Sequence, residues 1–240
     1  MYGRMIELSD CPSELARHRF DALYRRDRGG RLVSVNERDG RPAPRIHLMR
    51  TATVTIAGFR ADLPDHLVAR LAEVCAQEPK DKQLEKLPAG SATLLELLSS
   101  HAPVSRVWAG PVFQFAEQCR TSAGTVSINA TNKRLLWGGF DDWLPDVAHR
   151  QPFRAIVHGN RAISICASVR ISDAVHCAGV ETLAAFRRQG YAMQAASGWA
   201  VAVRMLGATP FYSTSWENEA SQSVANRLNL ALVGVDFHVT

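Results

Sequence analysis

A basic turn centred on a glycine, between an apolar strand and a helix, constrains this chain more than any other feature. Residues 177–183 form a strand-length run with few charges, and Arg187, Arg188 and Gly190 follow it. A turn that lays several backbone N–H groups against a phosphate needs a residue without Cβ at its tightest point, and Gly190 supplies it. The helix after the turn directs the positive end of its dipole at the same place. The stretch therefore predicts a site for a phosphate-bearing cofactor.

The helix after the turn has one apolar face and a clear end. Small and apolar residues recur in it at intervals of three and four, and Gly207 ends it as a C-cap. No Gly-x-x-x-x-Gly-Lys-Ser/Thr loop occurs in the sequence, and no Gly-x-Gly-x-x-Gly follows a strand. The turn at Gly190 is therefore the candidate phosphate site. The residues of the apolar face are Ala192, Ala195, Ala196, Trp199, Val203 and Leu206.

At these residues the chain resembles the GNAT superfamily of N-acetyltransferases. The family signature is Arg or Gln, two residues, Gly, one residue, then Gly or Ala, and residues 187–192 match it. A second strand at 210–216 follows, and Asn218 then opens another helix, as in the family. The resemblance covers residues 103–240. It implies an α/β (α+β) fold of the GNAT type, with a mixed, mostly antiparallel central sheet flanked by helices.

The elements around the turn have the order that this fold requires. Gly159 and Asn160 separate two strand-length runs, 153–158 and 161–169, which predicts a β-hairpin. We place a domain boundary near residue 102, so that 103–240 is the predicted GNAT acetyltransferase domain. Residues 1–102 form an N-terminal α/β region of unknown role, either an extension or a degenerate second GNAT-like half. A further strand is predicted at 104–115, and Gly110 and Pro111 within it indicate a bulge or an edge position.

The resemblance also implies how acetyl-CoA is held. Main-chain groups of the strand before the turn would bind the pantetheine arm, which the Asn after the second strand would also contact. The amides of the turn, with its arginine side chains, would bind the pyrophosphate. No metal is implied. The implied cofactor residues are Val180, Thr182, Arg187, Arg188, Gln189, Gly190, Tyr191, Ala192, Asn218 and Ser221.

The general base is open between two residues of the strand before the turn. His176 stands where histone-type members of the family keep a glutamate base, and a histidine can accept a proton near neutral pH. Glu181 is a carboxylate in an apolar strand beside the cofactor turn, where burial without a role would be costly. On the last strand, Asp236 and His238 share a face and could form a base with its orienting carboxylate, although a surface ion pair is the simpler interpretation.

The general acid is open as well. Many members of the family have a tyrosine seven residues after the asparagine that opens the helix, where it protonates the departing thiolate. This sequence has Ala225 there. Tyr212, Ser221 or water could take over the role, or the protein could be slow or inactive.

Three functions follow from these observations. The first is an acyltransferase that moves an acetyl group from acetyl-CoA to a primary amine of an unidentified small-molecule or protein acceptor, by direct attack in a ternary complex. The second is a catalytically weak acyl-CoA-binding or regulatory module, because of Ala225. The third is a basic protein that interacts with nucleic acid, because the net charge of +5 arises within residues 1–60. A solvated helix face is the simpler reading of these arginines, so nucleic acid is disfavoured. They are Arg17, Arg19, Arg25, Arg26, Arg28 and Arg31.

The remaining composition predicts a reduced, soluble, cytoplasmic protein. The sequence has five cysteines without a C-x-x-C spacing, which favours free thiols over a disulfide framework or a zinc site. No apolar run approaches the length of a membrane span, and the first residues lack the apolar segment of a signal peptide. A homodimer is left open.

Overall fold

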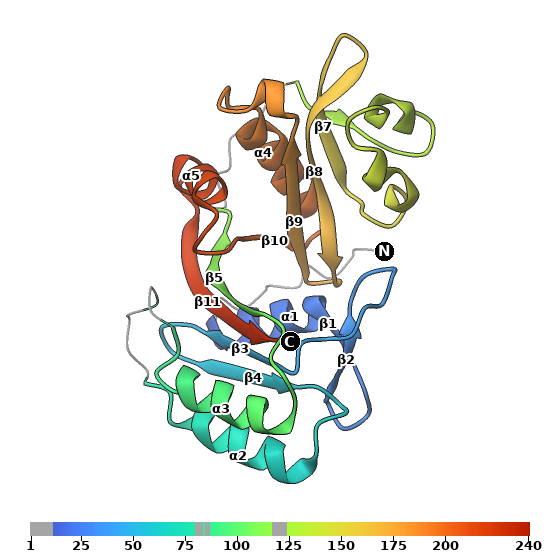
Figure 1. The fold of residues 1–240 in the computed structure, drawn as a ribbon. Helices are drawn as coiled ribbons and strands as arrows, with labels where there is room; N and C mark the ends of the chain where they lie inside the picture. The colour runs from blue at the N-terminus through green and yellow to red at the C-terminus, as the bar shows by residue number, and fades with distance from the viewer. Residues whose placement is uncertain (1–11, 80–83, 85–86, 117–123) are drawn as a thin grey trace, which may run out of the picture.

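Strands from both ends of the chain form one nine-stranded sheet in the computed structural model, shown in Figure 1. The structure describes residues 12–79, 84, 87–116 and 124–240. The α-helices are α1 (Pro12–Leu23), α2 (Asp65–Ala76), α3 (Ser91–His101), α4 (Tyr191–Met205) and α5 (Glu219–Arg227). The 3-10 helices are η1 (Lys133–Leu136), η2 (Asp141–Asp146) and η3 (Ala184–Phe186).

The sheet has the order β4-β3-β11-β5-β10-β9-β8-β7-β6, and β1 pairs with β2 in a separate hairpin. Neighbours in the sheet run antiparallel except for β9 and β10, which are parallel. The prediction of a mixed, mostly antiparallel sheet is therefore confirmed. The strands are β1 (Tyr24–Arg26), β2 (Leu32–Val35), β3 (Ile46–Arg50), β4 (Thr55–Phe59), β5 (Val107–Gln114), β6 (Val126–Ser127), β7 (Phe153–His158), β8 (Arg161–Ile171), β9 (Val175–Thr182), β10 (Thr209–Ser213) and β11 (Ala231–Val239).

Strand β5 lies in the middle of the sheet, between β11 and β10. Of the two alternatives predicted from Gly110 and Pro111, a bulge or an edge position, the edge position is therefore wrong. A Cβ on Gly110 would lie 1.8 Å from the carbonyl oxygen of Thr214, so glycine is required there by the close approach of another backbone. Because β3 pairs with β11, strands from both sides of the predicted boundary at residue 102 share one sheet. The boundary itself stays a prediction.

Helices cover both faces of the sheet (Figure 1). Alternate residues of β3 show how this happens: Ile46 and Leu48 pack in the cluster that contains α2 and α3, whereas Met49 packs in the cluster with α1. Helix α4 covers the C-terminal part of the sheet, and its Trp199 is fully buried there against Phe115. This anchoring fixes where the N-terminus of α4 points.

A buried ionic network joins α1 to the last strand. Arg19 donates two hydrogen bonds to Asp236, at 3.0 and 2.7 Å, and His47 lies 3.1 Å from the same carboxylate. The hydroxyl of Tyr24 contacts the other ring nitrogen of His47 at 2.7 Å. The simpler interpretation of Asp236 and His238, a surface ion pair, is thus wrong, because Asp236 is buried and its partners come from other elements.

Local backbone predictions agree with the structure at the turns. Gly159 and Asn160 have φ values of 56° and 63°, as a tight hairpin between β7 and β8 requires. Gly207 has a φ of 81° just after α4, as a C-cap requires. Cys75, Cys166 and Cys177 are free and buried, while Cys11 and Cys119 lie outside the described residues.

Candidate functional site

A cleft of about 960 Å³ lies between the end of β9, the N-terminus of α4 and the start of α5. All of the residues predicted to hold a cofactor line it, except Gln189. Of the two predicted bases, Glu181 lines the cleft, and His176 does not. The structure thus brings together residues that lie up to 41 positions apart in the sequence, from Val180 to Ser221.

One wall of the cleft is an open strand edge. The parallel pairing of β9 with β10 reaches only to Cys177 and Phe211, whereas β9 continues to Thr182 with β8 as its partner. The amide of Leu183 donates to β8, at the carbonyl of Ile163. Because peptide groups alternate in direction along a strand, the main-chain groups of Thr182 and Val180 face the open edge instead.

The turn after β9 has the backbone geometry of a cradle that could hold an anion. Arg188 and Gly190 both have left-handed backbone conformations, with φ values of 64° and 84°. Gly190 is the N-cap of α4, and no side-chain cap occupies that end of the helix. The amides of the first turn of an α-helix have no acceptor within the helix, so they point outward into the cleft. Together with the helix dipole, they favour a bound anion.

The polar side chains of the turn have different roles. Arg187 donates from Nε to the carbonyl of Thr182 at 3.2 Å, which braces the turn against β9. Arg188 is exposed and lines the cleft, and its side chain forms no hydrogen bond or ion pair with the described residues. Gln189 donates to the carbonyl of Ala185 at 3.3 Å and is not part of the lining, so its predicted contact with a cofactor finds no support in the geometry.

The opposite wall is formed by α5 and β10. Asn218 caps α5, because its side-chain oxygen accepts the amide of Ser221 at 3.0 Å. The hydroxyl of Ser221 lies 2.6 Å from that of Tyr212, whose ring is buried in the wall of the cleft. Burial raises the pKa of Tyr212, although its hydrogen bond to Ser221 opposes the shift. Ala225 is fully buried in the same core cluster and presents no polar atom to the cleft.

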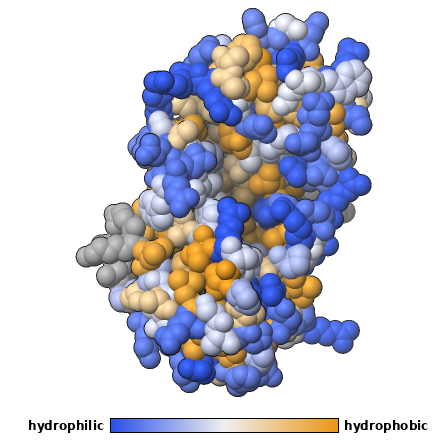
Figure 2. Space-filling model, viewed as in Figure 1, coloured by the Kyte–Doolittle hydropathy of each residue, from blue (hydrophilic) through white to orange (hydrophobic). Residues whose placement is uncertain are grey.

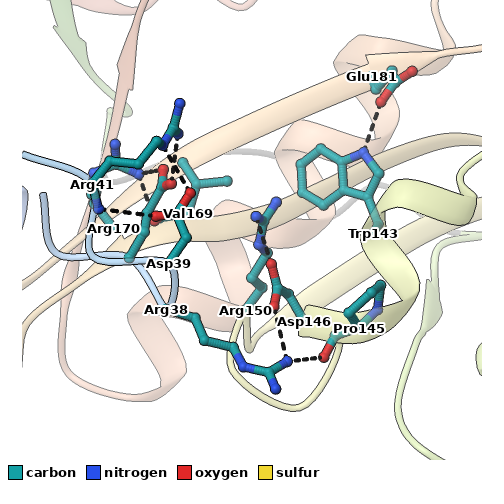
Figure 3. A network of polar contacts seen from close by, with 11 residues as sticks. Arg38, Asp39, Arg41, Trp143, Pro145, Asp146, Arg150, Val169, Arg170 and Glu181 are labelled. Atoms are coloured by element: carbon teal, nitrogen blue, oxygen red, sulfur yellow. Dashed lines mark hydrogen bonds and ion pairs between the residues drawn. The ribbon is translucent and has the colours of Figure 1, made fainter.

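Glu181 lies on the face of β9 opposite to the one that packs against α4, and the indole of Trp143 binds its carboxylate. Nε1 of Trp143, in η2, donates to the Glu181 carboxylate at 2.7 Å (Figure 3). A Cβ on Gly179 would lie 2.9 Å from the end of the Trp143 ring, so the glycine makes room for the indole on the strand. The sequence does not indicate this contact, because nothing around Trp143 in its irregular segment points to a partner on a distant strand.

His176 belongs to the core under α4. Its Nδ1 lies 2.8 Å from the hydroxyl of Ser168, which also accepts a hydrogen bond from Trp199 at 3.0 Å. Burial lowers the pKa of His176. The residue is buried and absent from the cleft, so the geometry gives no support to the catalytic role predicted for it.

The order of elements around the cleft decides the fold. A hairpin (β7 and β8) leads through β9, the cradle and α4 to β10, α5 and β11, and β9 separates from β10 where the cleft opens. The fold is of the GNAT type. No protein-family model matches the sequence, and no curated protein matches it.

Several solved structures with the GNAT fold are similar to this chain at low sequence identity. An acetyltransferase from the GNAT family of Colwellia psychrerythraea is 12% identical, with 77% of this chain and 76% of that chain covered and a TM-score of 0.47. A GCN5-related N-acetyltransferase-like protein from Streptococcus suis is 14% identical, with 82% and 85% covered and a TM-score of 0.46. A GCN5-related N-acetyltransferase from Sphaerobacter thermophilus is 13% identical, with 84% and 78% covered and a TM-score of 0.45.

The described residues contain neither a membrane-spanning helix nor a cluster of metal-ligating side chains. None of the helices in the described ranges combines the length and the apolar character needed to cross a membrane. Within the same part of the chain, no three His, Cys, Asp or Glu side chains are grouped so that they could hold a metal ion.

Proposed function

We propose that this chain is an acetyl-CoA-dependent N-acetyltransferase that moves an acetyl group to a primary amine by direct attack in a ternary complex. One observation carries the proposal. The cradle at Gly190, the N-terminus of α4 and the open edge of β9 line the same cleft. A pyrophosphate suits the cradle, and an extended amide-containing arm suits the unpaired strand edge. A ligand that contains both groups would therefore engage both walls at once.

The donor groups in the cleft match coenzyme A in their chemistry. The outward amides of Tyr191 and Ala192, with Arg188 nearby, suit the charge of a diphosphate. Main-chain groups of Val180 and Thr182 can bind the amides of the pantetheine arm as a neighbouring strand would. When bound, acetyl-CoA would supply an acetyl thioester to this cleft.

The chain's own residues would move the protons. Glu181 is the carboxylate of β9 that lies at the cleft, and Trp143 fixes its orientation. In the proposed reaction Glu181 accepts a proton from the amine as the new C–N bond forms and the C–S bond breaks. Tyr212, paired with Ser221, donates a proton to the departing thiolate. Its raised pKa keeps the phenol protonated at neutral pH, which a donor requires.

Glu181→Gln should lower kcat about 100-fold while the affinity for acetyl-CoA stays unchanged, because a general base contributes on the order of 10²–10⁴-fold to rate. The measurement is thiol release over a panel of primary amines, together with calorimetric titration of acetyl-CoA. Glu217→Gln is the matched control, since Glu217 is exposed and absent from the cleft lining. Equal kcat values for Glu181→Gln and the control would remove Glu181 from the mechanism.

Tyr212→Phe should lower kcat roughly tenfold and make the rate depend on the acidity of the leaving thiol. The ring and its packing remain, so only the hydroxyl beside Ser221 is lost. The check compares acetyl-CoA with an acetyl thioester of a more acidic thiol: the variant should recover rate with the better leaving group. A uniform loss with both donors would mean that Tyr212 supports the structure of the wall instead.

Two experiments separate this function from the alternatives. Calorimetric titration with acetyl-CoA should show binding, and thiol release should then depend on added amine. Binding without turnover of any amine would favour an acyl-CoA-binding module, the alternative that Ala225 motivates. Absence of binding would defeat the proposal.

The arrangement of the N-terminal arginines gives little support to a function in nucleic-acid binding. Arg19 is buried, Arg26 pairs with Asp21 at 2.7 Å, and Arg31 pairs with Asp65 at 2.7 Å. Three of the six arginines on which this function is based are therefore buried or paired with a carboxylate. Retention on a nucleic-acid column at physiological salt would contradict this reading.

A further inference from the structure

A second cavity, of about 320 Å³, lies where the N-terminal part of the chain meets the C-terminal part. One side consists of Arg25 of β1 and residues 36–38, which follow β2. The other side consists of the last residue of η2, two residues just after it and three residues of β8: Asp146, His149, Arg150, Ser168, Val169 and Ile171. Figure 2 shows the molecule in the orientation of Figure 1, with hydrophilic residues along both sides of the drawn face and hydrophobic residues toward its middle.

The walls of this cavity are rich in arginine, and their carboxylates are already paired. The carboxylate of Asp146 forms ion pairs with the guanidinium groups of Arg150, at 2.8 Å, and of Arg38, at 3.4 Å. Figure 3 shows both contacts. The carboxylate of Glu37 pairs with two arginines, Arg41 and Arg170. Arginines thus outnumber the carboxylates that face them, which gives the cavity a positive potential.

Arg25 is the cation that the network leaves available. Its guanidinium donates to the main-chain carbonyl of Glu37 at 3.3 Å, and no ion pair with a carboxylate is formed within the described part of the chain. The remaining N–H groups of its fork can bind a carboxylate or a phosphate. Arg38, on the same side of the cavity as Arg25, is held in place by a hydrogen bond to the carbonyl of Pro145 at 2.9 Å.

The cavity is close to Glu181 on the same face of the sheet. Val169 in the wall of the cavity packs against Gly179 of β9. A Cβ built on Gly179 would lie 2.4 Å from the Val169 side chain. Gly179 and Glu181 are two residues apart on one face of β9, a separation of roughly 7 Å along the strand. Trp143 connects the two places as well: its indole binds Glu181 and its ring face lies 4.7 Å from the Arg150 guanidinium.

We infer that this cavity binds the anionic group of the acceptor whose amine reaches Glu181. The acceptor class is therefore a primary amine that carries a carboxylate or a phosphate at its other end. The inference rests on the proposed function. It gives the N-terminal part of the chain a role, which is to supply Arg25 and Arg38 for recognition of the acceptor.

Calorimetric titration with simple amines, in the presence of saturating coenzyme A, tests the inference. The probes are 6-aminohexanoate, 6-aminohexyl phosphate and the uncharged 6-amino-1-hexanol. At least one anionic probe should bind roughly tenfold more tightly than the alcohol, as a charge-assisted hydrogen bond implies. The stronger of the two identifies the anionic group. Equal affinity of all three probes, or no binding of any, would overturn the inference.

Arg25→Gln should remove the tenfold preference for the anionic probe and leave binding of the alcohol unchanged. Arg25→Lys should restore part of the preference, because the charge returns without the planar fork. Arg134→Gln, an exposed arginine of η1 outside the cavity, is the control and should behave as the unchanged protein. If the Arg25→Gln variant keeps the tenfold preference, this cavity is not the site that binds the anionic group. Coenzyme A binding is measured in the same samples, so failure of the proposed function would be visible separately.

Discussion

Gly190→Glu should weaken coenzyme A binding by more than 100-fold in a protein that remains folded. Gly190 has a φ of 84°, and no atom would contact a Cβ built there within 4 Å, so the side chain would extend into open space at the cleft. The new carboxylate would lie at the N-terminus of α4, where the diphosphate is expected, and would repel it. Binding is measured by calorimetric titration, and folding by thermal melting.

The chain offers a matched control at the other end of the same helix. Gly207 has a φ of 81° and also has no atom within 4 Å of a built Cβ, but it is absent from the cleft. Gly207→Glu should therefore cost a similar 1–2 kcal/mol or so of stability through left-handed strain and leave coenzyme affinity unchanged. Gly190→Ala separates strain from charge. If Gly190→Glu binds coenzyme A as well as Gly207→Glu does, the cradle is not the phosphate site.

The sequence predicts the local structure around the 960 Å³ cleft well because these elements are built from local signals. The glycine at the turn, the apolar face around Trp199 and the cap at Asn218 each act through residues a few positions away. The same holds for the hairpin at Gly159 and Asn160, where both residues have positive φ. Such elements form for reasons that a short stretch of sequence already contains.

The parts that the sequence does not predict depend on distant partners. Arg19 and Asp236 are 217 positions apart, and neither residue type suggests burial in a sequence of this kind. Strand β5 contains Gly110 and Pro111, which resembles an edge, yet a neighbouring backbone at Thr214 explains the glycine. The contact of Trp143 with Glu181 and the cavity at Arg25 likewise join segments whose meeting is decided by the fold. The sequence alone therefore leaves His176 and Glu181 as alternative bases.

Asp236→Ala should lower the free energy of unfolding by about 3–5 kcal/mol, the usual cost of leaving one member of a buried ion pair without its partner. The guanidinium of Arg19 would remain buried between α1 and the sheet, and His47 would also lose its neighbour. Urea denaturation monitored by tryptophan fluorescence measures the change. Asp21→Asn is the control in α1: its pair with Arg26 is exposed to solvent, so about 1 kcal/mol or less is expected.

The buried pair of Arg19 and Asp236 should also make the free energy of unfolding fall at acid pH. Although burial opposes ionisation, Arg19 and His47 hold the folded-state pKa of Asp236 well below its usual range. The stability it contributes is therefore complete above the unfolded pKa of about 3.9 and is lost as pH falls from there toward the folded pKa. Removing both charges in Arg19→Met with Asp236→Leu should cost less than Asp236→Ala alone, because no uncompensated charge stays buried. A double variant no more stable than the single variant would show that the pair contributes through packing and not through its charges.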